Sequence, residues 1–354
     1  MAILTEPIGS IPRPLELIEA IQSFAVGRLS REALEEAYEK ATLDTIRRFE
    51  ETGSPVITDG EQRKSSFATY PLDGIENLAP DGAVIPFADG HTRQLPRLAR
   101  GPFRYSKYAG SFVQKAQPHA KKPLKQAVIS ASALSLLYPA NGIEAYPREA
   151  FLSDLIRESV ADIRSAFDAG AEVVQIDFTE GRLSLKLDPS GGLLKSFIDL
   201  NNRVLDHFSA AEQLHIGVHV CPGGDHDSTH SADVDYSALL PALFDLKVNR
   251  FYFQMASEQN PKRVLRHISQ LIKPVQRIFI GVTDPLNPII ESAQQVCERV
   301  VEAAFFIPVQ QLGTTDDCGF SPFADDTSTA RDVAFKKISA RIKGTALAAE
   351  QLGF

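Results

Sequence analysis

Short runs of apolar residues recur along the chain, and the longer segments between them place apolar residues at helical spacing. The short runs are rich in β-branched residues and predict eight strands, at 2–5, 55–58, 126–130, 173–177, 216–220, 250–253, 277–281 and 309–312. Several are apolar at nearly every position, which is typical of strands covered on both faces in a parallel sheet. The longer segments predict amphipathic helices, for example at 148–169, 193–209, 259–272 and 292–304.

Eight strands that alternate with helices predict an α/β protein built as a single (β/α)8 TIM barrel. The segment 65–123 interrupts this alternation with short alternating runs, Asp-Gly pairs and several prolines. These features predict a β-hairpin insertion after the second strand. We therefore expect one domain over 1–354, with an insertion at about 65–123.

Polar residues follow the predicted strands at the points where the strands end. They are Asp59 and Glu61, Asp177, His219 and Cys221, Gln254, Asp284, and Asp316 with Asp317 and Cys318. In a (β/α)8 barrel the active site is built at the C-terminal ends of the strands. The sequence therefore predicts that these side chains gather around one site.

The charge and composition of the chain indicate which kinds of binding partner to expect. The 37 basic and 45 acidic residues give a net charge of −8, and no long basic run indicates a nucleic-acid surface. The first residues lack the pattern of a signal peptide, and no apolar run reaches the length of a membrane helix. We expect a cytoplasmic location, where the three cysteines stay reduced, and we expect partners to be small molecules.

Two of the three cysteines lie in polar motifs that suggest a metal site. His219 and Cys221 are two residues apart, so both side chains point to one face of a strand. An isolated pair of this kind is often only a buried Cys beside a hydrogen-bonded His. Here Pro222 and two glycines end the strand beside the pair, and Cys318 lies between Asp317 and a glycine. Two thiolates and an imidazole favour Zn²⁺ with an open fourth position.

Such a site can activate a substrate thiol, because the charge of the metal favours the thiolate. Activation of water is the rival use of an open zinc position. His226 and His230 can assist as acid–base groups, or they can belong to a polar loop that caps the next helix. Cys297 lies on a helical pattern and is interpreted as a structural residue.

Three carboxylates can hold a substrate ammonium group at the predicted barrel mouth, namely Glu61, Asp177 and Glu180. Each of them is also compatible with an ordinary hydrogen-bonding role in a loop. Ser10, which follows the first strand in the motif Ile-Gly-Ser, offers a hydroxyl and backbone N–H groups to a carboxylate.

These motifs, in this order, resemble the C-terminal catalytic barrel of the cobalamin-independent methionine synthase family. The resemblance covers essentially the whole chain and about half of the two-barrel enzyme. It implies that His219, Cys221 and Cys318 are zinc ligands and that Ser10, Glu61 and Asp177 hold homocysteine. It also implies methyl transfer from a folate to the homocysteine thiolate, which gives methionine.

The chain departs from the family pattern at three points. Gln254 occupies the position of a further glutamate zinc ligand, and Glu258 lies four residues beyond it. The segment 282–287 contains no histidine, although the family has a proton-donating one there. The chain has no Trp near the expected folate ring, where Tyr138 lies instead. These departures predict a retained thiol site and an altered methyl-donor site.

The leading hypothesis is a zinc-dependent methyl or alkyl transferase acting on a small thiol, most simply homocysteine, with a folate-derived or other donor. Asp284 and Asp317, with Asp316 nearby, are candidates for proton transfer or orientation. The alternative is carbon–sulfur bond formation or lysis on another thiol, similar to epoxyalkane:coenzyme M transferase. A sulfonate thiol of that kind requires Arg or Lys, and Arg13, Arg63 and Arg182 keep this alternative open.

Two further functional classes account for fewer of these residues. A metal-binding barrel without catalysis would explain the missing histidine and glutamate, but not the retained carboxylates. A decarboxylase of the uroporphyrinogen type would leave both cysteine motifs unexplained.

Overall fold

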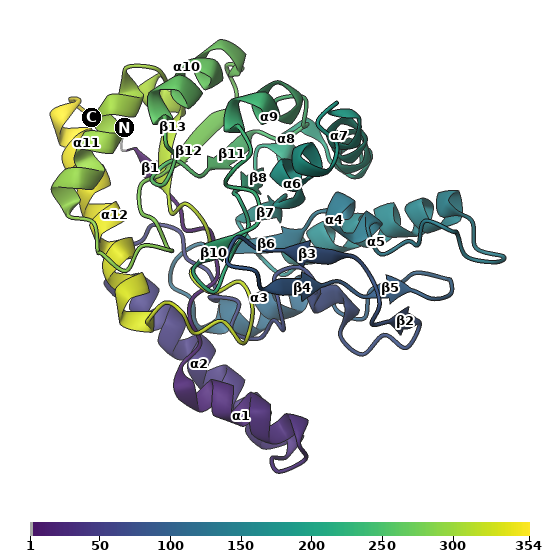
Figure 1. The fold of residues 1–354 in the computed structure, drawn as a ribbon. Helices are drawn as coiled ribbons and strands as arrows, with labels where there is room; N and C mark the ends of the chain where they lie inside the picture. The colour runs from purple at the N-terminus through teal and green to yellow at the C-terminus, as the bar shows by residue number, and fades with distance from the viewer. Residues whose placement is uncertain (1–2) are drawn as a thin grey trace.

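A parallel β-sheet of seven strands forms the centre of the protein in a computed structural model that describes residues 3–354 (Figure 1). In spatial order the strands are β1 (Leu4–Thr5), β13 (Leu312–Thr315), β12 (Arg277–Gly281), β11 (Arg250–Phe253), β8 (Ile216–Val220), β7 (Val173–Asp177) and β6 (Lys125–Ile129). Every neighbouring pair in this sheet is parallel. The α/β prediction is confirmed, and the sheet is consistent with a TIM-like barrel.

The sheet is covered on both faces, as its continuous apolar runs predict. All five residues of β6, β7 and β8 are buried. In the register of β7 with β8, Asp177 lies opposite His219. The C-terminal ends of these neighbouring strands therefore lie at one edge, where their polar residues meet.

Helices pack outside the arc of strands, as Figure 1 shows. They are α1 (Leu15–Ala25), α2 (Arg31–Glu51), α3 (Gly110–Ala116), α4 (Ala131–Ser135), α5 (Arg148–Asp168), α6 (Glu180–Leu187), α7 (Gly192–Leu205), α8 (Ala210–Gln213), α9 (Tyr236–Leu243), α10 (Pro261–Leu271), α11 (Ala293–Ala304) and α12 (Arg331–Gln351). The four helices expected from the pattern correspond to α5, α7, α10 and α11. Helices α1 and α2 extend away from the body of the molecule.

The predicted strand at 309–312 is wrong by three residues. Val309–Gln311 form a short 3-10 helix, η3, and the strand begins only at Leu312. Pro308 has no N–H for a sheet ladder, and Val309 and Gln310 lie near the surface, whereas all four residues of β13 are buried. Burial in the sheet, rather than local apolar character, sets the position of this strand.

The first two predicted strands are shorter than expected. The first is β1, and Ala2 of the predicted range lies outside the described residues. The second, at 55–58, is present as a single parallel bridge between Ile57 and Leu124. Two backbone hydrogen bonds accompany the bridge, from Ile57 N to Pro123 O at 3.0 Å and from Lys125 N to Ile57 O at 2.8 Å.

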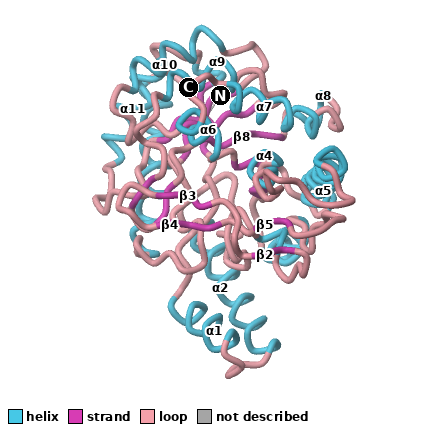
Figure 2. The backbone as a smooth tube through the Cα atoms, turned by 45° about the vertical axis from the view of Figure 1, so that its right-hand side comes forward, coloured by secondary structure: helices cyan, strands magenta, loops and turns pink. Residues whose placement is uncertain are grey.

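Two small antiparallel pairs lie between residue 65 and β6, apart from the main sheet (Figure 2). Strand β2 (Leu78–Ala79) pairs with β5 (Arg97–Leu98), and β3 (Val84–Pro86) pairs with β4 (Thr92–Gln94). The same region contains the 3-10 helices η1 (Tyr70–Leu72) and η2 (Gln117–His119). A further pair, β9 (Gly224–Asp225) with β10 (Ser228–Thr229), follows β8.

Helices α11 and α12 pack closely because Gly344 has no side chain. A Cβ atom at this position would lie 2.4 Å from Cβ of Val296 and 2.5 Å from the carbonyl oxygen of Ala293.

No helix within residues 3–354 combines the length and the apolar character needed to cross a bilayer.

Candidate metal centre and substrate cavity

The side chains of His219, Cys221 and Cys318 meet at the C-terminal edge of the sheet. His219 lies on β8, Cys221 follows that strand directly, and Cys318 follows β13. One ligand atom from each residue lies within 4.8 Å of the others, and the two Sγ atoms are 3.3 Å apart. Residues 97 positions apart in the sequence thus form one compact cluster.

The cluster has ligand atoms that are free to bind a metal ion. Both ring nitrogens of His219 are buried and have no hydrogen-bond partner among the described residues. Such buried polar atoms are costly unless something binds them. The backbone N–H of Gly223 donates to Sγ of Cys221 at 3.4 Å. Hydrogen bonding to Cys221 and burial raise the pKa of Cys318 well above its ordinary value when no metal is bound. The donor set therefore fits a metal ion.

A cavity of about 360 Å³ opens beside this cluster. Its lining includes His219 and Cys318 together with the three predicted substrate residues, Ser10, Glu61 and Asp177. The fold thus brings together residues from the segment after β1, the segment after 58, β7, β8 and the segment after β13. A reactant in this cavity would touch both the cluster and the polar groups.

Ser10 joins the first and the last parts of the cavity wall. Its Oγ accepts a hydrogen bond from Ser321 N at 3.2 Å, and its carbonyl oxygen accepts one from Phe320 N at 3.0 Å. A Cβ atom at Gly319 would lie only 2.2 Å from Oγ of Ser10, so glycine is required for this approach.

Glu61 is a buried carboxylate that already has a cationic partner. Nζ of Lys64 lies 2.9 Å from Oε1 of Glu61 and donates to the carbonyl oxygen of Ala127 at 2.8 Å. The backbone of Glu61 has a φ of 57°, and Oδ1 of Asp59 accepts its N–H at 2.9 Å. This strained conformation fixes the direction of the carboxylate. Lys64 could not be predicted as a site residue, because the sequence offers no signal for it beyond its spacing of three residues from Glu61.

Asp177 is buried at the end of β7. Its Oδ1 accepts a hydrogen bond from Nε2 of Gln175 at 2.8 Å. Burial raises the pKa of the Asp177 carboxyl, and the charge of Glu61 raises it further. Because no basic side chain within residues 3–354 forms an ion pair with Asp177, its charge remains available to a ligand.

The two predicted catalytic aspartates do not line this cavity. Oδ1 of Asp317 accepts the N–H groups of Met255 and Ala256, each at 2.8 Å, and Oδ2 accepts N–H and Oγ of Ser257, each at 2.7 Å. The carboxylate of Asp284 accepts Leu286 N at 3.0 Å, and burial raises its pKa. These contacts favour roles in holding loops.

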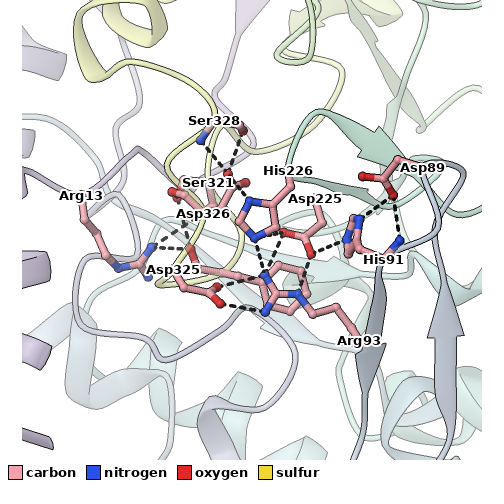
Figure 3. A network of polar contacts seen from close by, with 11 residues as sticks. Arg13, Asp89, His91, Arg93, Asp225, His226, Ser321, Asp325, Asp326 and Ser328 are labelled. Carbon is pink, nitrogen blue, oxygen red and sulfur yellow. Dashed lines mark hydrogen bonds and ion pairs between the residues drawn. The ribbon is translucent and has the colours of Figure 1, made fainter. Parts of the chain in front are cut away.

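A polar network lies over the cavity and joins three separate segments (Figure 3). Arg93 on β4 donates to Asp225 through Nε at 2.5 Å and to Asp325 through Nη1 at 2.9 Å. The guanidinium group also lies 4.2 Å from the ring centroid of Phe323. His226 is partly exposed and contacts Arg93 in this network, while His230 lines the cavity with Nδ1 2.6 Å from Oγ of Ser231.

Comparison with known proteins identifies the family. The family described as "Cobalamin-independent synthase, Catalytic domain" matches residues 3–334. The chain belongs to the cobalamin-independent methionine synthase family. Members of this family are homocysteine methyltransferases.

Individual relatives match this chain over almost their full length. A curated methionine synthase of Sulfolobus acidocaldarius is 24% identical and covers 98% of this chain and 93% of its own. A second curated methionine synthase, from Saccharolobus solfataricus, is 21% identical, and the match covers 98% of this chain and 95% of the relative. A solved B12-independent methionine synthase of Shewanella sp. W3-18-1, in complex with selenomethionine, has a TM-score of 0.78 at 17% identity and covers 99% of each chain.

The residues at the expected position of a further metal ligand, Gln254 and Glu258, are held by other groups. Oε1 of Gln254 accepts Nη1 of Arg182 at 2.6 Å, and its Nε2 donates to Ser257 Oγ at 2.8 Å. Glu258 accepts a hydrogen bond from Asn260 N, and neither residue belongs to the metal-ligating group found within the described residues. Tyr138 lies outside the central cavity, where its OH donates to the carbonyl oxygen of Tyr146 at 2.8 Å.

Glu180 is the third carboxylate that the sequence places at the predicted barrel mouth, and it lines the cavity. It begins α6, is 4% exposed, and lines the same wall as Asp177. Its spacing of three residues from Asp177 was a weak signal. Cys297, in contrast, is buried on α11 and does not line the cavity, as expected of a structural residue.

Proposed function

We propose that this chain is a zinc-dependent methyltransferase that methylates the sulfur of homocysteine and releases methionine. The main observation behind this proposal is the cluster of His219, Cys221 and Cys318. Its imidazole has no hydrogen-bond partner among the described residues, and the cluster borders a cavity lined by carboxylates. Membership of a homocysteine methyltransferase family supports the reaction. Two sulfur ligands and one nitrogen ligand favour zinc over harder cations.

A zinc ion at this cluster would lower the pKa of a substrate thiol and so favour the nucleophilic thiolate. The residues of the chain bind and orient the amino acid that carries the thiol. Glu61 and Asp177 accept hydrogen bonds from the ammonium group, and Ser10 donates its hydroxyl to the carboxylate. Both carboxylates are more than nine-tenths buried, so their attraction to the ammonium group is weakly screened.

The charges of the cavity favour an amino-acid thiol over a sulfonate thiol. Arg13 donates to the carbonyl oxygens of Glu61 and Lys64, and it lies outside the cavity lining. Arg63 pairs with Glu35 at 2.6 Å, and Arg182 donates to Gln254. These arginines are therefore not free to bind a sulfonate. The selenomethionine complex of the Shewanella relative is also consistent with an amino-acid site.

The contacts of segment 55–58 support a complete (β/α)8 barrel in one domain. Segment 55–58 continues the sheet beyond β6 through the Ile57 bridge. Oγ1 of Thr58 donates to the carbonyl oxygen of Gly9 at 2.7 Å, and Ile11 N donates to Gly60 O at 3.0 Å. These bonds connect segment 55–58 to the region after β1 and would close the ring, with 65–123 as the insertion.

Metal analysis of purified protein tests the proposed zinc site. We expect about one zinc ion per chain, and we expect Cys221→Ser and Cys318→Ser to remove most of it because each deletes one thiolate ligand. Cys297→Ser is the matched control, since this thiol lies outside the cluster. Zinc well below one per chain, or a content unchanged by both substitutions, contradicts the proposal.

Metal-edge X-ray absorption tests the proposed substrate. Homocysteine is expected to add a sulfur atom to the zinc shell, whereas coenzyme M and glutathione are not, because the cavity supplies carboxylates rather than free cations. Asp177→Asn is expected to weaken homocysteine binding about tenfold or more by removing a buried charge partner. If no thiol enters the shell, alkyl transfer at this site has to be abandoned.

A further inference from the structure

Lys64 is a fully buried cation that reaches the cavity only through another residue. Its Nζ donates to Oε1 of Glu61 at 2.9 Å and to the carbonyl oxygen of Ala127 at 2.8 Å, and it lies 4.6 Å from the ring centroid of Tyr70. Among the described residues Glu61 belongs to the cavity lining and Lys64 does not. Any effect of Lys64 on a ligand therefore has to pass through Glu61.

Lys64 keeps its positive charge although it is buried. Burial lowers the pKa of its ammonium group, but the carboxylates of Glu61 and Asp59 raise it by more, and the net shift is upward. The carbonyl of Ala127 and the ring of Tyr70 add favourable contacts for the ion. Removal of this cation would leave the carboxylate of Glu61, which is 3% exposed, as a buried charge without compensation.

The two oxygens of the Glu61 carboxylate have different surroundings. Oε1 is bound by Lys64, and no other hydrogen bond formed within residues 3–354 ends on this carboxylate. Oε2 is not enclosed by the protein, and the residue lines the cavity. One oxygen is thus fixed by the protein, and the other is left for a ligand.

The backbone around Glu61 and Lys64 supports the same orientation. The N–H of Lys64 donates to the carbonyl oxygen of Glu61 at 3.1 Å and closes the turn. Nη2 of Arg13 donates to the carbonyl oxygens of both residues, at 2.9 Å and 2.7 Å. Through Ala127 the Lys64 side chain also attaches this turn to β6. The ion pair and the turn therefore form one rigid unit.

The charges of this end of the cavity match one ammonium group. Glu61 and Asp177 supply two negative charges, and Lys64 supplies one positive charge. Asp59 and Arg13 bind the backbone of Glu61 and add one charge of each sign. Without Lys64, two buried carboxylates would share a single ammonium group, and like charges in a buried site disfavour each other.

We propose that Lys64 is a positioning residue of the amino-acid site: by binding Oε1 of Glu61, it directs Oε2 to the ammonium group of the thiol substrate. This inference rests on the proposed function, because it concerns the residue that holds the amino group of homocysteine. Lys64 does not touch the substrate. Its effect is to make the cavity prefer a thiol that carries an ammonium group over the same thiol without one.

Calorimetric binding to the zinc-containing protein tests this preference without turnover. The two ligands are homocysteine and 4-mercaptobutanoate, which has the same thiol and carboxylate but lacks the ammonium group. The unaltered protein is expected to bind homocysteine more tightly. Lys64→Met is expected to weaken homocysteine binding about tenfold or more and to change binding of 4-mercaptobutanoate much less. Lys107→Met, which removes an exposed lysine paired with Asp73, is the control and is expected to bind both ligands as the unaltered protein does.

A double-mutant cycle tests whether Lys64 acts through Glu61. Glu61→Gln alone is expected to weaken homocysteine binding, and addition of Lys64→Met is expected to cause no further loss. A purely structural effect of Lys64 would instead add its own loss to that of Glu61→Gln. The double variant removes both charges of the pair, so it can be measured even where Lys64→Met alone does not fold. Zinc content shows which variants are folded.

The outcomes separate this inference from the proposed function. A preference for homocysteine that survives Lys64→Met, an equal loss for both ligands, or a further loss in the double variant overturns the inference and retains the proposed function. Homocysteine that does not bind to the unaltered protein, or does not enter its zinc shell, overturns the proposed function and this inference with it.

Discussion

At the scale of single residues, the ionisation of Glu180 opposes folding. Burial raises the pKa of Glu180 to about 7, although the Ser130 and Ser132 hydroxyls lower it, and the charge of Asp177 raises it further. The folded protein therefore binds this proton more tightly than the unfolded chain does. Stability contributed by the group is present below its unfolded pKa of about 4.3 and is lost as the pH rises towards 7.

This dependence predicts a pH-sensitive effect of Glu180→Gln on stability. At pH 8 the variant is expected to be more stable than the unaltered protein, because it no longer has to ionise a buried carboxyl. At pH 5 that gain is expected to disappear. Each tenfold change in proton affinity corresponds to about 1.4 kcal/mol. Thermal unfolding across this pH range provides the measurement, with Glu144→Gln as the control; a gain that does not depend on pH would contradict the explanation.

The sequence contains enough information to place some site residues but not others. The spacing of His219 and Cys221 indicates one face of a strand, and the position of Cys318 after a strand indicates the same sheet edge. The partner of Glu61 is different, because Lys64 meets it only through a strained turn with a φ of 57°. The free oxygen of Glu180 also depends on tertiary structure, since Ser130 and Ser132 come from another element.

At the scale of elements, Asp317, a predicted candidate for proton transfer or orientation, organises a loop through its hydrogen bonds. Asp317 accepts three backbone N–H groups from residues 255–257, directly after β11. Its neighbour Asp316 accepts Nε of Arg341 at 3.0 Å and Oγ1 of Thr283 at 2.7 Å. These bonds attach the segment that carries Cys318 to β11, β12 and α12. Local sequence could not reveal this, because the partners are distant along the chain.

The contact between α11 and α12 predicts the cost of adding one methyl group. Glycine inside an exposed helix is usually less stable than alanine by about 1 kcal/mol. At Gly344 the opposite sign is expected, because a Cβ atom would overlap Val296 and the carbonyl of Ala293. Gly344→Ala is expected to lower the free energy of unfolding by roughly 1–3 kcal/mol. Urea denaturation measures this change, and a stabilised variant would show that the two helices separate easily.

At the scale of the whole molecule, the Arg93 network joins three segments of the chain beside the cavity (Figure 3). It connects β4 to the turn between β9 and β10 and to the segment around Asp325, so that three parts of the chain meet above the site. Asp225 is 1% exposed, and removing its cationic partner would leave a buried charge without compensation.

Arg93→Gln is therefore expected to loosen these three segments together. Hydrogen exchange measured by mass spectrometry should become faster at 84–94, 224–229 and 319–328, while exchange in β7 and β8 stays unchanged. Arg97→Gln is the matched control, because Arg97 pairs with the exposed Asp81 and lies outside the network. Faster exchange at 84–94 alone would mean that the network does not couple the segments.

The fold class could be predicted from the sequence because it depends on a repeated pattern. Continuous apolar runs alternate with amphipathic helices over most of the chain, and five of the predicted strands lie within one residue of β6, β7, β8, β11 and β12. The cavity wall could not be predicted in the same way. Residues such as Ile85 and Phe87 come from the irregular segment 65–123, whose position depends on contacts with distant loops.

The pairing of β1 with β13 has a consequence for the order of events during synthesis. Leu4 and Thr5 are synthesised about 300 residues before their partners Gly313 and Thr314, so this pairing forms only after the intervening segment has been made. The same pairing brings Ser10 and Cys318 to one cavity, and a nascent chain contains His219 and Cys221 long before Cys318 is made. Binding of the proposed zinc ion would therefore be among the last steps in the maturation of this protein.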